Sequence, residues 1–191
     1  MKLSQKYLEA LNFALVKHDS QTRKGTGIPY FAHVSAVSSL AMEYGADEDQ
    51  AIAALLHDTM EDCDVTKAEL EETFGPRVAG IVADCTDSEQ VPKPPWHDRK
   101  RKYLEHLDGV HSDTFLVSAC DKLHNARAIV RDVRYEGAAV WTRFSAKPED
   151  ILWYYESLLA VFERRLKCPS LLGDFRAEVK AMRELVKEQA G

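Results

Sequence analysis

The sequence predicts an all-α protein, a bundle of about eight to ten helices. In most segments the apolar residues recur every three or four positions, which is the spacing of one helix face. Residues that favour helix starts, such as Ser4, Asp47 and Thr66, precede several of these segments. No segment has the alternating apolar pattern or the Asn-Gly turn that is typical of β-hairpins.

Length and composition indicate a single domain. The 191 residues suit a core over about residues 1–165 and a helical extension over about 170–191, which either covers the core or mediates contacts in a homo-oligomer. With a net charge of −6, we expect no general affinity for nucleic acid. No apolar run approaches the ~20 residues that cross a membrane. The four cysteines form no C-x-x-C pair, which disfavours a disulfide framework and a zinc ribbon and favours a reducing cytoplasm.

The first three helices are predicted from their end signals. A helix over about residues 4–22 begins with a serine cap. A second helix over residues 29–44 begins with a proline, which suits the first helical position, and a glycine follows its end. A third helix begins after the aspartate cap at position 47 and continues to about residue 62.

The middle of the chain contains two short helices, a loop and a basic helix. Residues 66–75 begin with a capping box and end at a glycine, and Pro76 begins the next helix. Residues 88–96 contain three prolines, so we expect a loop there. A basic helix follows from His97.

The last third of the chain is also predicted to be helical. The apolar run at residues 115–120 could form a strand, but its pattern continues with helical spacing to about Tyr135, so we expect one long helix. Pro148 begins the following helix. Pro169 interrupts the pattern, and Asp174 caps a final helix.

A group of polar residues follows a buried helix in the segment A-A-L-L-H-D-T-M-E-D, residues 53–62. Side chains three or four apart share a helix face, so we expect His57 beside Glu61 and Asp58 beside Asp62. Three carboxylates and an imidazole cannot be buried together unless something neutralises them, and a divalent metal ion is the simplest candidate. The alternative is a helix whose last turn faces water.

Two distant residues can complete such a site. His33 lies on the apolar face of the second helix, where a single histidine is more often a hydrogen-bonded core residue than a metal ligand. Asp121 follows the apolar run of residues 115–120, so one of its sides is expected to be buried and to need a partner. Alone, it would more often be a surface charge paired with a lysine or arginine.

Taken together, His33, His57, Asp58 and Asp121 form a plausible metal site. Two imidazoles and two carboxylates suit a divalent ion such as Mn²⁺, with zinc or iron as alternatives. Mixed nitrogen and oxygen ligands with open water positions are typical of a catalytic site. Such a metal lowers the pKa of bound water and polarises a phosphoryl oxygen.

Three motifs, in this order and spacing, resemble the hydrolase domain of the RelA/SpoT-type (p)ppGpp enzymes. They are R-K-G-T-G-I-P-Y-F-A-H, A-A-L-L-H-D-T-M-E-D and D-K-L-H-N-A-R. The H…HD…D pattern within them is the signature of the HD-type metal-dependent phosphohydrolases. The resemblance covers about residues 1–165, and it implies an HD-domain helical bundle that acts as a small alarmone hydrolase.

The resemblance also implies a reaction and the residues that perform it. The two histidines and two aspartates named above would hold the metal, usually manganese. Glu61 and Asp62 would position and activate the attacking water. The reaction would remove pyrophosphate from the 3′ side of guanosine tetra- or pentaphosphate and give GDP or GTP.

The same resemblance indicates substrate contacts. Arg23 and Lys24 match basic residues near the nucleotide, Asn125 matches a residue of the nucleoside pocket, and Tyr154 matches a pocket aromatic. Long family members have threonine where this chain has Ala128, so a contact to the base is either missing or replaced.

Other basic residues have two interpretations. Arg99, Lys100, Arg101 and Lys102 form either a solvated helix face or part of a site that neutralises the substrate's phosphates. Lys122 and Arg127 flank the Asp121 motif and are candidates for the same role.

Two other functions compete with alarmone hydrolysis. One is an HD phosphohydrolase that acts on another phosphorylated nucleotide, such as NADPH or a nucleoside monophosphate. The other is a non-catalytic domain that binds the alarmone as a sensor. The sequence argues against the sensor, because every ligand position and the Glu61–Asp62 pair are filled.

Overall fold

The computed structural model describes residues 2–87, 92 and 94–190. Within these residues, every continuous element of secondary structure is a helix. In chain order the elements are α1 (Gln5–Lys17), α2 (Phe31–Glu43), α3 (Glu48–Leu56), α4 (Thr59–Asp62), α5 (Lys67–Phe74), α6 (Pro76–Cys85), α7 (Trp96–Gly109), α8 (Ser112–Glu136), the 3₁₀ helix η1 (Gly137–Arg143), α9 (Pro148–Arg165) and α10 (Pro169–Ala190). The all-α prediction is therefore confirmed.

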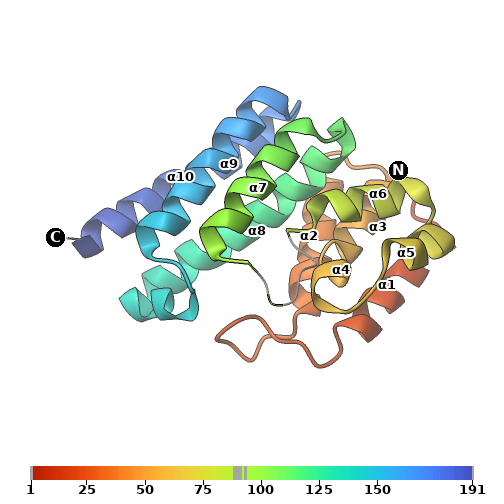
Figure 1. Ribbon diagram of the computed structural model, residues 1–191, viewed down its shortest axis with the longest axis horizontal. Coiled ribbons are helices and arrows are strands. Elements are labelled where there is room, and N and C mark those ends of the chain that lie inside the picture. Colours follow the sequence, from red (N-terminus) through yellow and green to blue (C-terminus); the bar gives the residue numbers. More distant parts are fainter. Residues whose placement is uncertain (1, 88–91, 93, 191) are drawn as a thin grey trace.

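Helix α8 is the central element of the fold. It has 25 residues and contacts α2, α3 and α6 as well as α9, α10 and η1. Figure 1 shows α1–α6 gathered at one end of the molecule and α9 and α10 at the other, with α7 and α8 between them. A residue in the middle of α8 can therefore meet side chains from the first 60 residues of the chain.

The predicted long helix is confirmed in α8, including its strand-like apolar run. Residues 114–121 of this helix are all buried. Because neighbours cover α8 on every side here, this stretch needs no polar face, and its sequence alone cannot distinguish a buried strand from a buried helix.

Helix α1 ends earlier than predicted, at Lys17 rather than near Thr22. The following residues form a loop closed by backbone hydrogen bonds, from the N–H of Arg23 to the oxygen of Ile28 (2.8 Å) and from the N–H of Tyr30 to the oxygen of Gln21 (2.8 Å). Pro29 belongs to this loop, so α2 begins two residues later than predicted. These bonds join residues five and nine apart, which a local periodicity cannot reveal.

The predicted continuous helix over residues 47–62 is wrong, because the chain breaks between α3 and α4. The capping box at Asp47 is confirmed at the start of α3. At the other end, side chains take over helix carbonyls: His57 Nδ1 donates to the oxygen of Ala54 (2.8 Å), and the Thr59 hydroxyl donates to the oxygen of Leu56 (2.7 Å). Asp58 consequently lies at a bend between the two helices, with φ −100° and ψ 0°.

Helices α5 and α6 follow the prediction, with Thr66 capping α5 and Pro76 opening α6. Of the predicted loop 88–96, residues 88–91 and 93 lie outside the described part of the chain, and Trp96 already belongs to α7. Helix α9 begins at Pro148 as predicted.

The prediction for the last helix is wrong in its start. Helix α10 begins at Pro169 itself, which is compatible with proline at the first helical position, and not at Asp174. The carboxylate of Asp174 instead pairs with Arg127 of α8 (2.9 Å). The 3₁₀ helix η1 was not predicted. Among the described helices, none combines the length and apolar character that a membrane span requires.

Candidate metal centre and adjoining cavity

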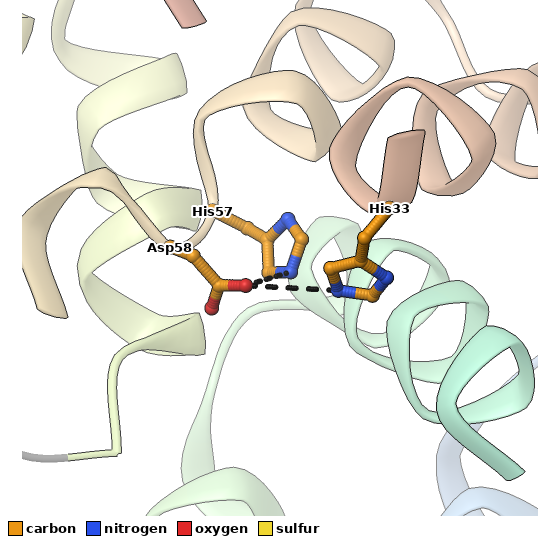
Figure 2. A group of neighbouring side chains, drawn as sticks. All are labelled: His33, His57 and Asp58. Carbon is orange, nitrogen blue, oxygen red and sulfur yellow. Dashed lines mark ion pairs between the residues drawn. The ribbon is translucent and has the colours of Figure 1, made fainter. Parts of the chain in front are cut away.

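Four side chains from three separate segments converge at the middle of α8. His33 comes from α2, His57 and Asp58 lie at the bend between α3 and α4, and Asp121 belongs to α8. Figure 2 shows His33, His57 and Asp58 pointing toward one another. The Asp58 carboxylate lies 3.6 Å from His33 Nε2 and 3.0 Å from His57 Nε2, and the Asp121 carboxylate lies 3.2 Å and 3.5 Å from the same two nitrogens.

The two histidine nitrogens at the centre fit a metal ion. Nε2 of His33 and Nε2 of His57 are buried and have no hydrogen-bond partner among the described residues, although carboxylate oxygens lie nearby. A buried nitrogen without a partner is costly, and a metal ion would satisfy both nitrogens together with the two carboxylates. The donor set of two imidazoles and two carboxylates therefore suits a divalent metal ion.

Hydrogen bonds on the far side of each ring direct Nε2 toward the centre. Nδ1 of His57 donates to the backbone oxygen of Ala54, which leaves the Nε2 lone pair available to a metal. Nδ1 of His33 lies 2.8 Å from Nδ1 of His124. Burial and the neighbouring His33 lower the pKa of His124 to about 4, so its ring is neutral and its Nδ1 can accept this hydrogen bond.

Both carboxylates are also held from outside. The Tyr30 hydroxyl donates to Asp58 Oδ2 at 2.6 Å. Lys122 and Asn125 donate to the two oxygens of Asp121, the latter at 2.6 Å. Burial alone would raise the pKa of Asp58, but His57 outweighs this effect and holds the carboxyl below its usual range, so it is ionised.

Glu61 and Asp62 lie on α4, one turn after the candidate ligands. Asp62 lines the adjoining cavity and accepts a hydrogen bond from Gln21 Nε2 at 2.8 Å. Glu61 accepts a bond from the backbone N–H of Asp87 at 3.3 Å. Asp62 is therefore the carboxylate of the pair that faces the cavity.

A cavity of about 420 Å³ lies beside the metal centre, because its lining includes Tyr30, Lys122 and Asn125, which bond to the candidate ligands Asp58 and Asp121. Its walls come from the loop before α2, from α4, α7, α8, η1 and α9. Among the described residues, its lining contains six cationic side chains against two carboxylates: Arg23, Lys24, Lys100, Lys122, Arg131 and Arg143 against Asp62 and Asp132. A polyanion of the size of a nucleotide matches this cavity in volume and charge.

The structure brings five of the six predicted substrate residues to this cavity, namely Arg23, Lys24, Lys122, Asn125 and Tyr154. Arg23 also donates to Asn125 at 2.8 Å and so joins the network around Asp121. Arg127 is not brought there. It pairs with Asp174 (2.9 Å) and Glu178 (3.8 Å) of α10. Arg127 follows Asp121 by six residues on α8, so its side chain points away from the helix face that carries Asp121.

The basic segment of α7 divides between the two interpretations. Lys100 lines the cavity and lies 2.9 Å from Asp87, and its ammonium sits over the Tyr154 ring at 4.8 Å. Arg99 pairs with the same aspartate. Arg101 and Lys102 are exposed, so they belong to the solvated helix face.

Several residues of this site escaped the sequence prediction. Tyr30 and His124 contact the candidate ligands, and Asp132 and Arg143 line the cavity. The first two stand inside the quoted motifs, so a closer look at those motifs could have found them. Nothing in the local sequence indicates that η1 folds over the cavity with Arg143.

Fold and site together define the class of the protein. A model of the HD domain matches residues 10–152, and the chain belongs to the HD-domain family.

Within this class, the chain is similar to enzymes that act on a guanine nucleotide. The guanosine-3′,5′-bis(diphosphate) 3′-pyrophosphohydrolase MESH1 of Danio rerio is 41% identical over 127 residues, which cover 65% of this chain and 69% of that protein. The Homo sapiens protein of the same name is 39% identical over 127 residues, with the same shares of both chains.

A solved structure supports the same relation. It belongs to a metazoan orthologue of SpoT that hydrolyses ppGpp, and it matches this fold with a TM-score of 0.75 and 26% identity, over 94% of this chain and 97% of that chain. The resemblance to small alarmone hydrolases is therefore confirmed.

Proposed function

We propose that this chain is a cytoplasmic, manganese-dependent hydrolase that removes the 3′-pyrophosphate of ppGpp and pppGpp and gives GDP or GTP. The observation that carries the proposal is the convergence of His33, His57, Asp58 and Asp121 beside a cavity with an excess of positive charge. The relatives named above, whose names specify this reaction, support the choice of substrate.

The four converging residues would hold the ion. A bound divalent metal would polarise the phosphoryl group and make water a stronger nucleophile at neutral pH. Two imidazoles and two carboxylates suit Mn²⁺, with zinc or iron as alternatives.

Asp62 and Glu61 would orient the attacking water. In the reaction, the water oxygen bonds to the phosphorus that is attached to the 3′ oxygen, the bond between that phosphorus and the 3′ oxygen breaks, and the 3′ oxygen takes up a proton. The Asp62 carboxylate lines the cavity and can accept the proton of the water. Glu61, which accepts a hydrogen bond from the backbone N–H of Asp87, would help to orient the water.

The cationic lining would bind the phosphates. Lys122 is held against Asp121, and Arg23 reaches Asn125, so both cations lie next to the metal centre. Their positive charges attract the 3′ phosphate chain, and they offset the negative charge that develops on the 3′ oxygen as it leaves.

A product assay tests this proposal. The purified protein is incubated with ppGpp and Mn²⁺, Zn²⁺, Fe²⁺ or Mg²⁺, and the products are separated. Pyrophosphate and GDP in equal amounts, formed fastest with Mn²⁺, are expected. Release of inorganic phosphate alone would instead indicate a phosphatase on another nucleotide, and the absence of any product would contradict the proposal.

A pair of matched variants tests the role of Asp62. Asp62→Asn should lower kcat by about 100-fold or more and leave metal binding unchanged, because it removes a proton acceptor and not a ligand. Asp64→Asn removes the same charge two residues along, at an exposed residue with φ +55° that asparagine tolerates, and should leave kcat unchanged. Equal kcat values for both variants would contradict the assigned role.

A further inference from the structure

The cavity extends along one face of α8, away from the metal centre. Lys122, Asn125, Ile129 and Asp132 line it, and their spacing of three or four residues places them on the same helix face. Ten residues of helix separate Lys122 from Asp132, which corresponds to about 15 Å. A nucleotide whose phosphate chain reaches the metal can therefore extend toward Asp132.

Apolar side chains form part of the cavity wall. Ala128 and Ile129 lie between Lys122 and Asp132 on α8, and Val140, Phe144 and Ile151 also line the cavity. A phosphate chain would lose its hydration against such walls without compensation, whereas the flat, weakly hydrated face of a purine suits them. The base is therefore expected in the middle of the cavity, with its hydrogen-bonding edge toward Asp132.

The Asp132 carboxylate lies at the far end of the cavity and can accept further hydrogen bonds. Its Oδ2 accepts one hydrogen bond, from Arg143 Nη1 at 3.0 Å, and its Oδ1 accepts two from Arg131, at 2.9 and 2.7 Å. The Arg131 side chain is 58% exposed, so this ion pair is weak and can yield to a ligand. Arg143 is only 17% exposed and keeps the carboxylate in place.

Arg143 is itself immobilised by the loop that carries Arg23 and Lys24. Its aliphatic part packs against the backbone of Gly25, whereas its guanidinium also reaches Glu136, a half-exposed partner that adds little. A Cβ atom at position 25 would lie 2.6 Å from Arg143 Cδ, so only glycine permits this approach. The Asp132 carboxylate is thus positioned by a contact between η1 and the loop before α2.

We propose that Asp132 selects guanine as the base of the substrate, with Arg143 as the residue that positions it. The proposal rests on the proposed nucleotide hydrolysis. A carboxylate can accept two parallel hydrogen bonds, and guanine presents two neighbouring donors, the N1–H and the 2-amino group. Hypoxanthine lacks the amino group, and adenine presents an acceptor at N1, so both bases leave the carboxylate incompletely paired. This contact also replaces a base contact at Ala128, one helical turn away.

The test compares three substrates that differ only in the base. The bis(diphosphates) of guanosine, inosine and adenosine are assayed for kcat/KM with the wild-type protein and with Asp132→Ala. The wild type should prefer guanosine over inosine by about tenfold or more, the effect of one hydrogen bond to a charged group. Asp132→Ala should bring this ratio close to one. Asp132→Asn keeps the side-chain volume and should shift the preference toward adenine, because an amide can both donate to and accept from that base.

Glu136→Gln is the matched control. It removes the other carboxylate that pairs with Arg143, at a residue outside the cavity lining, and should leave the guanosine-to-inosine ratio unchanged. A ratio that responds equally to Glu136→Gln and Asp132→Ala would overturn the proposal, since it would indicate a general effect on Arg143.

A binding experiment separates this proposal from the proposed reaction. The dissociation constants of the guanosine and inosine compounds are measured in an Asp62→Asn background, in which hydrolysis is blocked. The same tenfold preference, lost with Asp132→Ala, supports the base contact even if the wild type releases no pyrophosphate. Equal binding of both compounds, or binding of neither, overturns it.

Discussion

The Tyr30 hydroxyl offers a test of how the metal centre is held together. It donates to Asp58 Oδ2 at 2.6 Å, and burial together with Asp58 raises the pKa of Tyr30 far above its usual value, so the hydroxyl stays a donor. Tyr30→Phe removes this one hydrogen bond and keeps the ring, which packs against His18 and His33. The change therefore isolates the orientation of one ligand.

The expected losses of metal affinity and of stability follow from the kind of hydrogen bond that is removed. Loss of a partner outside the ligands weakens metal affinity by about 10- to 100-fold. At saturating metal, this corresponds to a loss of about 1.4 to 2.8 kcal/mol of metal-dependent stability. Without metal, the loss of a hydrogen bond to a buried charge should cost about 1.5 to 3 kcal/mol in the free energy of unfolding.

Metal affinity is measured by competition with a chelator, and the free energy of unfolding by denaturant titration with and without Mn²⁺. Tyr7→Phe is the control, because its hydroxyl lies 2.9 Å from the neutral Ser38 hydroxyl, away from the metal centre. It should cost about 0.5 to 1.5 kcal/mol and leave metal affinity unchanged. If Tyr30→Phe binds Mn²⁺ as tightly as the wild type, the hydroxyl does not orient Asp58 and the reasoning fails.

Three further predictions concern other parts of the structure. Glu61→Gln should lower kcat less than Asp62→Asn does, since Asp62 is the one of the two that lines the cavity, and steady-state kinetics would contradict this if the order were reversed. Asp47→Ala should cost about 1 kcal/mol at pH 7 by removing a helix cap. Burial would raise the pKa of Asp47, but Arg77 outweighs burial and lowers it, so the charge-dependent part of this difference should be lost as the pH falls from about 4 through the folded-state pKa, as a series of unfolding measurements from pH 7 downward would show. Gly25→Ala should destabilise the protein through its φ of +73° and its clash with Arg143, and adding Arg143→Ala should relieve only the clash; strictly additive free energies of unfolding would contradict this.

Helix ends followed from the sequence wherever a local signal decided them. The cap at Asp47, the cap at Thr66 and the proline starts at Pro76 and Pro148 all depend on contacts within about four residues. Apart from the start of α10, where the local signal at Pro169 was passed over for Asp174, the errors lie where a more distant contact or an unexpected side-chain bond competes. The break after Leu56 is one example, because His57 and Thr59 turn their side chains back onto helix carbonyls instead of continuing the helix.

The candidate ligands were predictable for a different reason. A histidine or an aspartate next to a long apolar run needs a partner, and this requirement marked His57, Asp58 and Asp121 as a group. The cavity wall could not be predicted in the same way. Arg127 ends the last family motif and Arg143 lies sixteen residues later, yet only Arg143 lines the cavity, because Arg127 is on the side of α8 that α10 covers.

The sequence by itself determined the all-α class, most helix starts, the four candidate metal ligands and the resemblance to alarmone hydrolases. The fold class and the helix starts follow from periodicity and caps and the candidate ligands from residue chemistry, which are local properties of the chain, while the resemblance rests on the three motifs. Only the tertiary structure decided that Asp58 lies at a helix break, that His124 and Tyr30 hold the ligands, and that η1 brings Arg143 and Asp132 together at the end of the cavity. The helix break rests on side-chain bonds to carbonyls three residues back, whereas the other contacts join residues 11 to 91 positions apart and depend on how the helices pack around α8.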